Sequence, residues 1–416
     1  MRVLLFFICV CFTLSLFAEG WILIPMDEVQ TDHLKAYGAA YFALTNGVKV
    51  EWLLYYRGGS FLMPYTKVVA DWCKQRGVLR EIIGPAEVQA IYATIEESNM
   101  DRVVLEKAPK IAVYIPPTSE PWDDAVSLAL EYAEIPYDRI WDDDVLSGEL
   151  YKYDWVHLHH EDFSGQYGKF YRNYRAAPWY QAMVKADLVL AKRLGYDKAW
   201  KMKHAVALEI KRYVEQGGLL FAMCSAPITL DIALSALDVD IIPAEIDGDG
   251  IDPNYQDKLD FSRTIAFEKF HLIPDIYVYE HSDVDVTEDA IARGQNSFFV
   301  LQEFSAKYDY VSAMLVQNHT KLIREFLGQD TGFRRKYLKR NVVILGLVPG
   351  TDEAKYIRGE LGKGAFAYLG GHDPEQFVHY VGDKPTNLSE HKNSPGYRLI
   401  LNNVLFPAAR KKKLKT

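Results

Sequence analysis

Cys224 has the sequence setting of a nucleophile. It ends the uninterrupted apolar run 219–223, which is typical of a strand buried on both faces. Ala222 and Ala226 flank it two positions away, and a helical pattern follows from about 229 to 237. A strand, a sharp turn between small residues and a helix form a nucleophile elbow, whose N–H groups stabilise an oxyanion and favour a thiolate. The alternative is a buried cysteine that packs as a small apolar side chain.

His372 is the candidate general base for this thiol. It follows the strand expected at 364–369, so it should emerge at the carboxyl edge of the sheet, where ligands bind. Glu375 or Asp373 can orient its imidazole. Asp373, Pro374 and Glu375 also suit the start of a helix, a role that leaves His372 free. The predicted catalytic residues are therefore Cys224, His372 and Glu375, with Asp373 as the other possible orienting group.

A cluster of histidines and acids ends another strand, expected at 153–159. His157 and His159 share one face of that strand, and residues 160–162 follow on the loop above it. We expect a polar lining that binds substrate. Imidazole and carboxylate from His157, His159 and Glu161 also suit zinc, and a hydrogen-bonded strand end without a metal is the simplest alternative. We predict no metal and no other cofactor.

Aromatic and basic residues are dense from 167 to 180, and Trp122 follows the strand expected at 110–115. Aromatic faces beside guanidinium groups can stack on sugar rings or other flat ligands, although they can also only pack a long loop. The predicted substrate-binding residues are His159, His160, Glu161, Asp162, Trp122, Tyr174 and Trp179.

The elements that must position these residues alternate between strand and helix from Lys110 onward. This order predicts an α/β fold with a doubly wound parallel sheet of the flavodoxin-like kind. Its expected strands lie at 110–115, 137–141, 153–159, 219–224, 342–346 and 364–369, with a closing helix at 396–405. Residues 247–340 are expected to form an insertion. A smaller α/β segment precedes this domain, with strands at 21–24 and 48–54 predicted to form a parallel pair.

The first residues have the pattern of an export signal. Arg2 precedes an apolar run at 3–17, and Ala18 and Gly20 place small residues at the cleavage positions. The run is shorter than the roughly 20 residues of a membrane-spanning helix. We therefore expect a signal peptide at 1–20 and an exported protein, periplasmic or extracellular, with no transmembrane segment. The other expected boundaries are 21–106 for the N-terminal segment, 107–410 for the main domain and 411–416 for a basic tail.

The net charge of −9 argues against a general nucleic-acid binder, which needs a basic face. We expect a small-molecule substrate, possibly a sugar or an amide, as the partner. After cleavage at residue 20, Cys73 and Cys224 are the two cysteines that remain. An oxidising compartment would permit one disulfide between them, which would silence Cys224 as a nucleophile.

With these motifs in place, the region from about 110 to 407 resembles the class I glutamine amidotransferase-like superfamily. Its closing part is similar to the trehalose-utilisation (ThuA-like) branch in residues 362–366, 371–375 and 397–403. The whole chain also resembles a family of exported bacterial proteins labelled asparagine synthetase B. That likeness rests on residues 24–28, 56–61 and 157–163.

The resemblance implies an amidotransferase-like protein that hydrolyses amide or acyl bonds with Cys224 and His372. The chain departs from the glutaminase pattern, because alanines flank Cys224 and Glu375 lies three residues after His372 rather than two. It also lacks the N-terminal cysteine and the Ser-Gly-Gly-x-Asp-Ser loop of a glutamine-dependent asparagine synthetase. The ThuA-like likeness implies a second possibility, a protein that binds carbohydrate or cell-wall fragments without catalysis. A metal-dependent hydrolase is a third.

Overall fold

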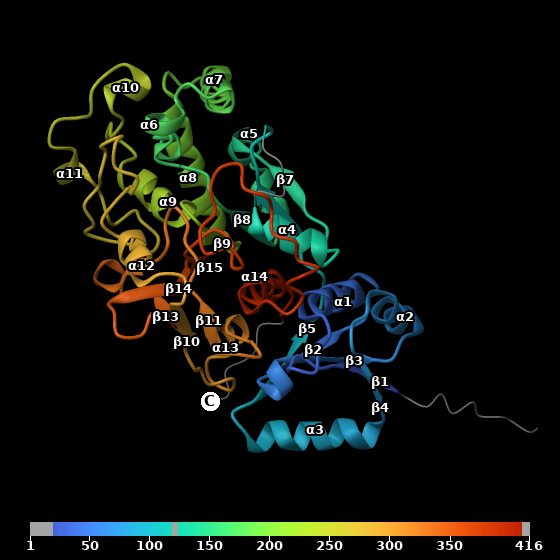
Figure 1. Ribbon diagram of the computed structural model, residues 1–416. Coiled ribbons are helices and arrows are strands. Elements are labelled where there is room, and N and C mark those ends of the chain that lie inside the picture. Colours follow the sequence, from blue (N-terminus) through green and yellow to red (C-terminus); the bar gives the residue numbers. More distant parts are fainter. Residues whose placement is uncertain (1–19, 119–123, 410–416) are drawn as a thin grey trace, which may run out of the picture.

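The computed structural model describes residues 20–118 and 124–409 (Figure 1). Residues 1–19 of the expected signal peptide and the whole basic tail lie outside these residues. Among the described residues, two sheets form the framework, one from the N-terminal segment and one from the rest of the chain. No helix in the described part is both long and apolar enough to cross a bilayer.

The smaller sheet is antiparallel, with the strand order β4-β1-β3-β2-β5. Its strands are β1 (Trp21–Ile24), β2 (Val50–Leu54), β3 (Ser60–Pro64), β4 (Glu81–Ile83) and β5 (Asp101–Leu105). The predicted parallel pair is wrong, because β3 lies between β1 and β2 and pairs antiparallel with both. The short turn at 55–59 leads from β2 directly into β3. A turn of this length can join antiparallel strands, whereas parallel strands need a much longer crossover.

Helices cover both faces of this sheet. α1 (His33–Thr45) and α2 (Lys67–Arg76) pack on one face, and α3 (Pro85–Glu97) packs on the other. Figure 1 shows α3 below the sheet and α1 between the sheet and the rest of the molecule. Cys73 is buried in α2 and is not bonded to Cys224, so the possible disulfide between them does not form.

The main sheet has the order β11-β10-β13-β14-β15-β9-β8-β6-β7. Its parallel half contains β6 (Ile111–Tyr114), β7 (Asp138–Ile140), β8 (Trp155–Leu158), β9 (Leu219–Met223) and β15 (Gly364–Leu369). Its antiparallel half contains β10 (Phe298–Leu301), β11 (Leu322–Arg324), β13 (Val343–Leu347) and β14 (Glu353–Leu361), with β12 (Phe333–Arg334) paired to β14.

The α/β class is confirmed, but the sheet is mixed rather than parallel throughout. The predicted parallel succession from 342–346 to 364–369 is wrong, because β14 was missed between these strands. Only Gly362 and Lys363 separate β14 from β15, and a two-residue connection closes an antiparallel hairpin. The expected insertion contributes β10, β11 and β12 to the same sheet.

Helices on the two faces of the parallel half come from different parts of the chain. α4 (Ala125–Tyr132) and α14 (Pro395–Leu405) pack on one face, and α8 (Ala199–Gln216) and α9 (Ala226–Ser235) pack on the other. Figure 1 shows α14 beside α1, where the two units meet. The remaining α-helices are α5 (Asp142–Leu146), α6 (Tyr171–Tyr174), α7 (Pro178–Arg193), α10 (Ala244–Asp247), α11 (Tyr255–Lys258), α12 (Thr287–Arg293) and α13 (Tyr310–Leu315).

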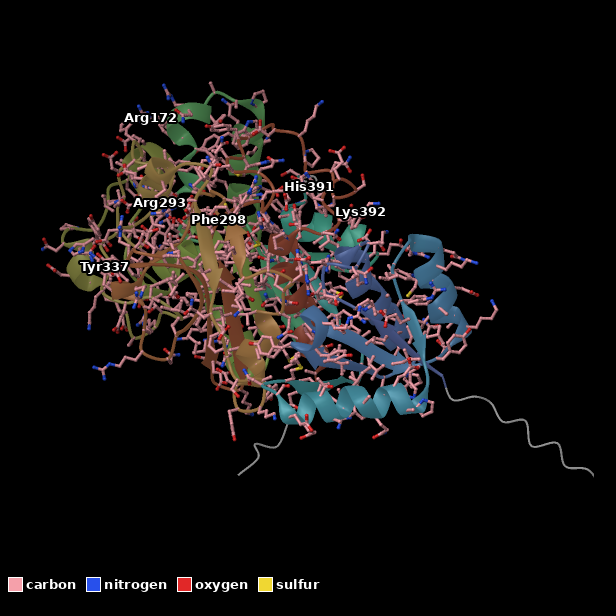
Figure 2. The ribbon with its side chains drawn as sticks, turned by 60° about the horizontal axis from the view of Figure 1, so that its bottom comes forward. Arg172, Arg293, Phe298, Tyr337, His391 and Lys392 are labelled. Carbon is pink, nitrogen blue, oxygen red and sulfur yellow. The ribbon has the colours of Figure 1, made fainter. Side chains whose placement is uncertain are left out.

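Arg398 of α14 fastens the N-terminal unit to the main domain. Its guanidinium is buried and donates to the backbone carbonyls of Met26 and Gly58 at 2.9 and 2.8 Å. The turn that contains Gly58 therefore serves this junction. Lys392, labelled in Figure 2, lies at the same boundary, where its carbonyl accepts from the N–H of Leu34.

Two stacked histidines complete the junction. The rings of His33 and His319 lie 4.4 Å apart, and Arg398 donates to Nδ1 of His319. Burial and the charge of Arg398 lower the pKa of His33 to about 4 and that of His319 to about 3. Both imidazoles are therefore neutral in the folded protein well below pH 6.5, where unfolded histidines become charged.

Acid should weaken the fold through this pair. Because the folded pKa values are depressed, the unfolded chain binds more protons below pH 6.5, and stability falls as the pH drops from about 6.5 to about 4. His319→Gln keeps an acceptor for Arg398 but cannot be protonated. We expect this variant to lose about 1–2 kcal/mol less than the wild type over that range, measured by urea unfolding. Identical pH profiles would contradict the assignment.

Candidate active site

Cys224 occupies a strained turn between β9 and α9. Its φ is 51°, in the left-handed region, and its N–H donates to the carbonyl of Gly371 at 3.1 Å. A left-handed backbone costs a residue with a side chain about 1–2 kcal/mol. Strain of this kind persists only where the surrounding structure imposes it, and it gathers at functional sites. The sharp strand-to-helix turn expected from the sequence is thus present at this residue.

The thiol is buried and accepts a hydrogen bond. Cys224 is 4% exposed, and the backbone N–H of Gln329 lies 3.3 Å from Sγ. A donor aimed at sulfur favours the thiolate over the thiol. Burial raises the pKa of Tyr279, and the charges of Cys224 and Asp330 add to that shift.

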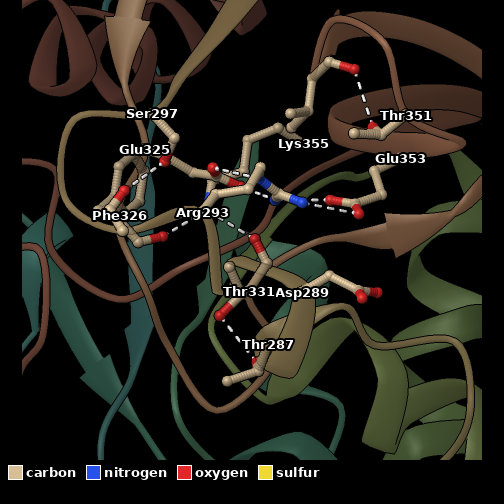
Figure 3. A network of polar contacts seen from close by, with 12 residues as sticks. Thr287, Asp289, Arg293, Ser297, Glu325, Phe326, Thr331, Thr351, Glu353 and Lys355 are labelled. Carbon is tan, nitrogen blue, oxygen red and sulfur yellow. Dashed lines mark hydrogen bonds and ion pairs between the residues drawn. The ribbon is translucent and has the colours of Figure 1, made fainter. Parts of the chain in front are cut away.

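A polar network holds the segment that carries Gln329 (Figure 3). Arg293 bridges Glu325 and Glu353 through paired hydrogen bonds of 2.5–3.1 Å. Lys355 of β14 donates to the carbonyls of Phe326 and Thr331, at the two sides of Gln329. Burial lowers the pKa of Lys355 to about 8, although Glu325 opposes the shift. β14, missed in the sequence, therefore supports the loop against the thiol.

Gly371 permits that loop to approach the strand ends. Its φ is +93°, and a Cβ there would lie 2.4 Å from the Phe326 ring and 2.6 Å from the Phe326 carbonyl oxygen. The N–H of Gly371 donates to the carbonyl of Asp330, and the N–H of His372 donates to that of Leu327. A side chain at 371 would separate the loop from the end of β15.

His372 contacts His159 rather than an acid next to it in sequence. Nδ1 of His372 lies 3.1 Å from Nε2 of His159, and the His379 ring stacks on His372 at 4.4 Å. Glu375, predicted to orient His372, instead forms an ion pair with His391 at 2.9 Å. The other candidate, Asp373, accepts from the N–H of Glu375 and from the Thr386 hydroxyl. The orienting group that the structure offers is therefore His159.

Behind His159 lie His157 and Asp124. The Asp124 side chain is 4% exposed and those of both histidines are fully buried. Burial lowers the pKa of His159 well below its usual range, although Asp124 opposes this shift. Burial raises the pKa of Asp124, but the facing His157 and His159 outweigh burial and hold it below its usual range. The three side chains therefore interact electrostatically as one buried group.

Glu161 and Asp162 hold the backbone after β8. The Glu161 carboxylate accepts from the N–H of His159, and the Asp162 carboxylate accepts from the N–H groups of Ser164 and Gly168. Nε2 of His281 lies 3.4 Å from Asp162. The two acids therefore shape the loop, whereas His160 is the partly exposed member of the cluster, with its ring against His159 at 5.5 Å.

Tyr174 and Trp179 belong to an aromatic cluster with Phe170 and Tyr180. The ring centroids of Tyr174 and Trp179 lie 5.2 Å apart, and Trp179 is 39% exposed. Trp122 lies outside the described residues. A hollow of about 440 Å³ lies farther along α7, lined by Tyr180, Leu188 and Val189 among others.

Sequence reasoning missed two residues of the site. Asp124 is the N-cap of α4, where its carboxylate accepts from the backbone N–H groups of Val126 and Ser127. Its place after β6, at the same carboxyl edge as His159, was the available signal. Gln329 acts through its backbone N–H, so its residue type carried no signal.

Comparisons with known proteins add little. No protein-family model matches the chain, and no curated protein matches it. Among solved structures, the chain is similar to a cytoplasmic protein, STM3548, from Salmonella typhimurium, with 12% identity, a TM-score of 0.36 and coverage of 73% of this chain and 100% of that one. It is also similar to a β-galactosidase from Bacillus circulans sp. alkalophilus, with 13% identity, a TM-score of 0.27 and coverage of 70% and 32%.

Strain at Cys224 can be measured by comparing two truncations. Cys224→Gly and Cys224→Ala both remove the sulfur, but glycine adopts a φ of 51° without cost. We expect the glycine variant to be more stable than the alanine variant by about 1 kcal/mol. The matched control is Cys73 within α2, where glycine should be less stable than alanine by about 1 kcal/mol. The same sign at both positions, in denaturant unfolding, would show that the elbow is unstrained.

Proposed function

We propose that the protein is an amidotransferase-like hydrolase that cleaves an amide or acyl bond of a small molecule with Cys224. The observation that carries this proposal is the left-handed backbone of Cys224 at the β9–α9 turn, with an N–H donor 3.3 Å from its sulfur. Nucleophiles on such elbows are held clear of their own strand and in front of a helix N-terminus.

The strand order of the parallel half supports the fold expected for such a protein. Taken in chain order, β6, β7, β8, β9 and β15 are arranged 2-1-3-4-5, the order of flavodoxin-like sheets. We propose that this half is the amidotransferase-like core and that the antiparallel half elaborates it. With residues 1–20 as a signal peptide, the enzyme would act in the periplasm or outside the cell.

In the proposed reaction, His372 takes the thiol proton and the Cys224 sulfur attacks the carbonyl carbon of the substrate. The N–H of Ser225, which follows the nucleophile, is the expected donor to the oxyanion. The tetrahedral intermediate collapses to a thioester as the leaving amine or alcohol takes the proton from His372. Water, deprotonated by the same imidazole, then releases the acid and restores the thiol.

His159 is the positioning residue for this base. Its Nε2, 3.1 Å from Nδ1 of His372, can accept the Nδ1 proton and so present Nε2 of His372 as the basic atom. This is the role that an acid next to His372 was expected to fill. Tyr174 and Trp179, which pack against each other, would contact a flat or sugar-like part of the substrate.

Thiol reactivity tests the nucleophile without knowledge of the substrate. We expect iodoacetamide to alkylate Cys224 quickly near pH 7 in the folded protein, followed by mass spectrometry of the peptides. Cys73 is an internal control, because burial raises its pKa to about 11 and it should resist until unfolding. If both cysteines resist equally, the thiol is structural, and the carbohydrate-binding alternative gains support.

Variants then separate the roles of the neighbouring residues. For any amide or ester that the protein turns over, Cys224→Ser should lower kcat by on the order of 10⁴–10⁶. His159→Gln should shift the acidic limb of the pH–rate profile while leaving KM nearly unchanged, as expected for a positioning residue. Glu375→Gln, matched in size and outside the His159–His372 contact, should leave the profile in place. A shift with Glu375→Gln but not with His159→Gln would reverse the assignment.

A further inference from the structure

Three ligand atoms face one another behind the thiol site. Nε2 of His157 and Nδ1 of His159 lie 3.3 Å apart, and each lies 3.4 Å from Oδ1 of Asp124. They therefore form a nearly equilateral triangle, which we call the Asp124 triad. His157 reaches it from β8, His159 from the residue that follows the strand, and Asp124 from the start of α4.

Protons alone satisfy this triangle poorly. Nδ1 of His157 lies 3.0 Å from the carbonyl oxygen of Phe221 and must donate to it, so a neutral His157 presents a lone pair at Nε2. A proton on Nδ1 of His159 can be donated to His157 or to Asp124. In either case the contact between Nε2 of His157 and Oδ1 of Asp124 has no proton and brings two acceptors together. The two 3.4 Å separations are also longer than the 2.7–2.9 Å or so of charge-assisted hydrogen bonds. Oδ2 of Asp124 is buried and has no hydrogen-bond partner among the described residues.

We propose that Asp124, His157 and His159 bind a zinc ion. Zinc ligands at about 2.0–2.1 Å in tetrahedral geometry lie about 3.3–3.4 Å from one another, which matches all three edges of the triad. Octahedral ligands at about 2.1 Å, as for Mg²⁺, would lie about 3.0 Å apart. Two imidazoles and one carboxylate leave the fourth tetrahedral position for water or Oδ2 of Asp124.

Each member of the triad also has the outer partner that metal ligands require. Nδ1 of His157 donates to Phe221, Nε2 of His159 contacts His372, and Oδ1 of Asp124 accepts from Val126 at 2.7 Å. Such contacts fix the ring orientation and the tautomer of ligating histidines. Glu161, the acid that the sequence suggested for a zinc site with His157 and His159, bonds the backbone of His159 instead.

The test uses the full chain after treatment with a chelator and titration with Zn²⁺. We expect one ion per chain by elemental analysis and calorimetry, and a raised Tm, because the ion binds the folded state. Cobalt should bind the same site with the intense visible absorption of a tetrahedral centre. Failure of the wild-type chain to bind one zinc ion at micromolar concentration would overturn the proposal.

Variants locate the ion. Asp124→Asn keeps a good N-cap for α4 and should weaken binding by more than about 100-fold, beyond the 10–100-fold typical of outer partners. His157→Gln should do the same, which covers the case in which the first variant folds poorly. His281→Gln removes a comparable buried histidine–aspartate pair and should bind zinc like the wild type.

Two further variants separate this site from the thiol site. His160→Gln and Cys224→Ser should both keep zinc binding. Loss of binding with either would place the ion elsewhere, on the outer histidines or on the sulfur, and would overturn the proposal. The test of the nucleophile is independent of this result, because alkylation of Cys224 is measured on the chelator-treated protein.

Discussion

The parallel register of β8, β9 and β15 is the constraint on which the site depends. β9 pairs with β8 through Leu158 and Ala222, and with β15 through Met223 and Leu369. The three strands therefore end at one level, and the next residues deliver His159, Cys224 and His372 to one edge. Backbone hydrogen bonds extend this register past the strands, from Cys224 to Gly371 and from Ala226 to His159. The turn at Cys224 must satisfy both of these hydrogen bonds, and its positive φ is consistent with that requirement.

That edge is buried, so its polar groups need partners from elsewhere in the chain. The antiparallel half of the sheet supplies them: Lys355 holds the two carbonyls beside Gln329, and Arg293 neutralises Glu325 and Glu353. Burying a lysine whose hydrogen bonds go to neutral carbonyls is costly, and burial lowers its pKa to about 8. In return, the lysine fixes the loop that holds the Gln329 N–H against the thiol.

The sequence could predict the elbow and the edge because both follow from local pattern and strand polarity. An apolar run before Cys224 and a glycine pair before His372 are enough to place both residues at strand ends. It could not predict what lies behind them. Whether His372 meets Glu375 or His159 depends on how two strands far apart in sequence are spaced by a third. Similarly, β14 contains Lys355, Arg358 and Glu360 in a pattern too polar to suggest a buried strand, and its pairing was visible only in the two-residue hairpin.

His159 connects the thiol site and the Asp124 triad through its two ring nitrogens. An ion on Nδ1 would fix the remaining proton on Nε2, so that His159 donates and Nδ1 of His372 accepts. Without an ion, a proton on Nδ1 faces Asp124 and His157, and Nε2 can accept from His372 instead. The two states present opposite tautomers of His372 to the thiol. Ion binding at the Asp124 triad and the basicity of His372 toward the Cys224 thiol would then be linked through the single ring proton of His159. His159 is fully buried, so this proton moves between its two ring nitrogens rather than to solvent.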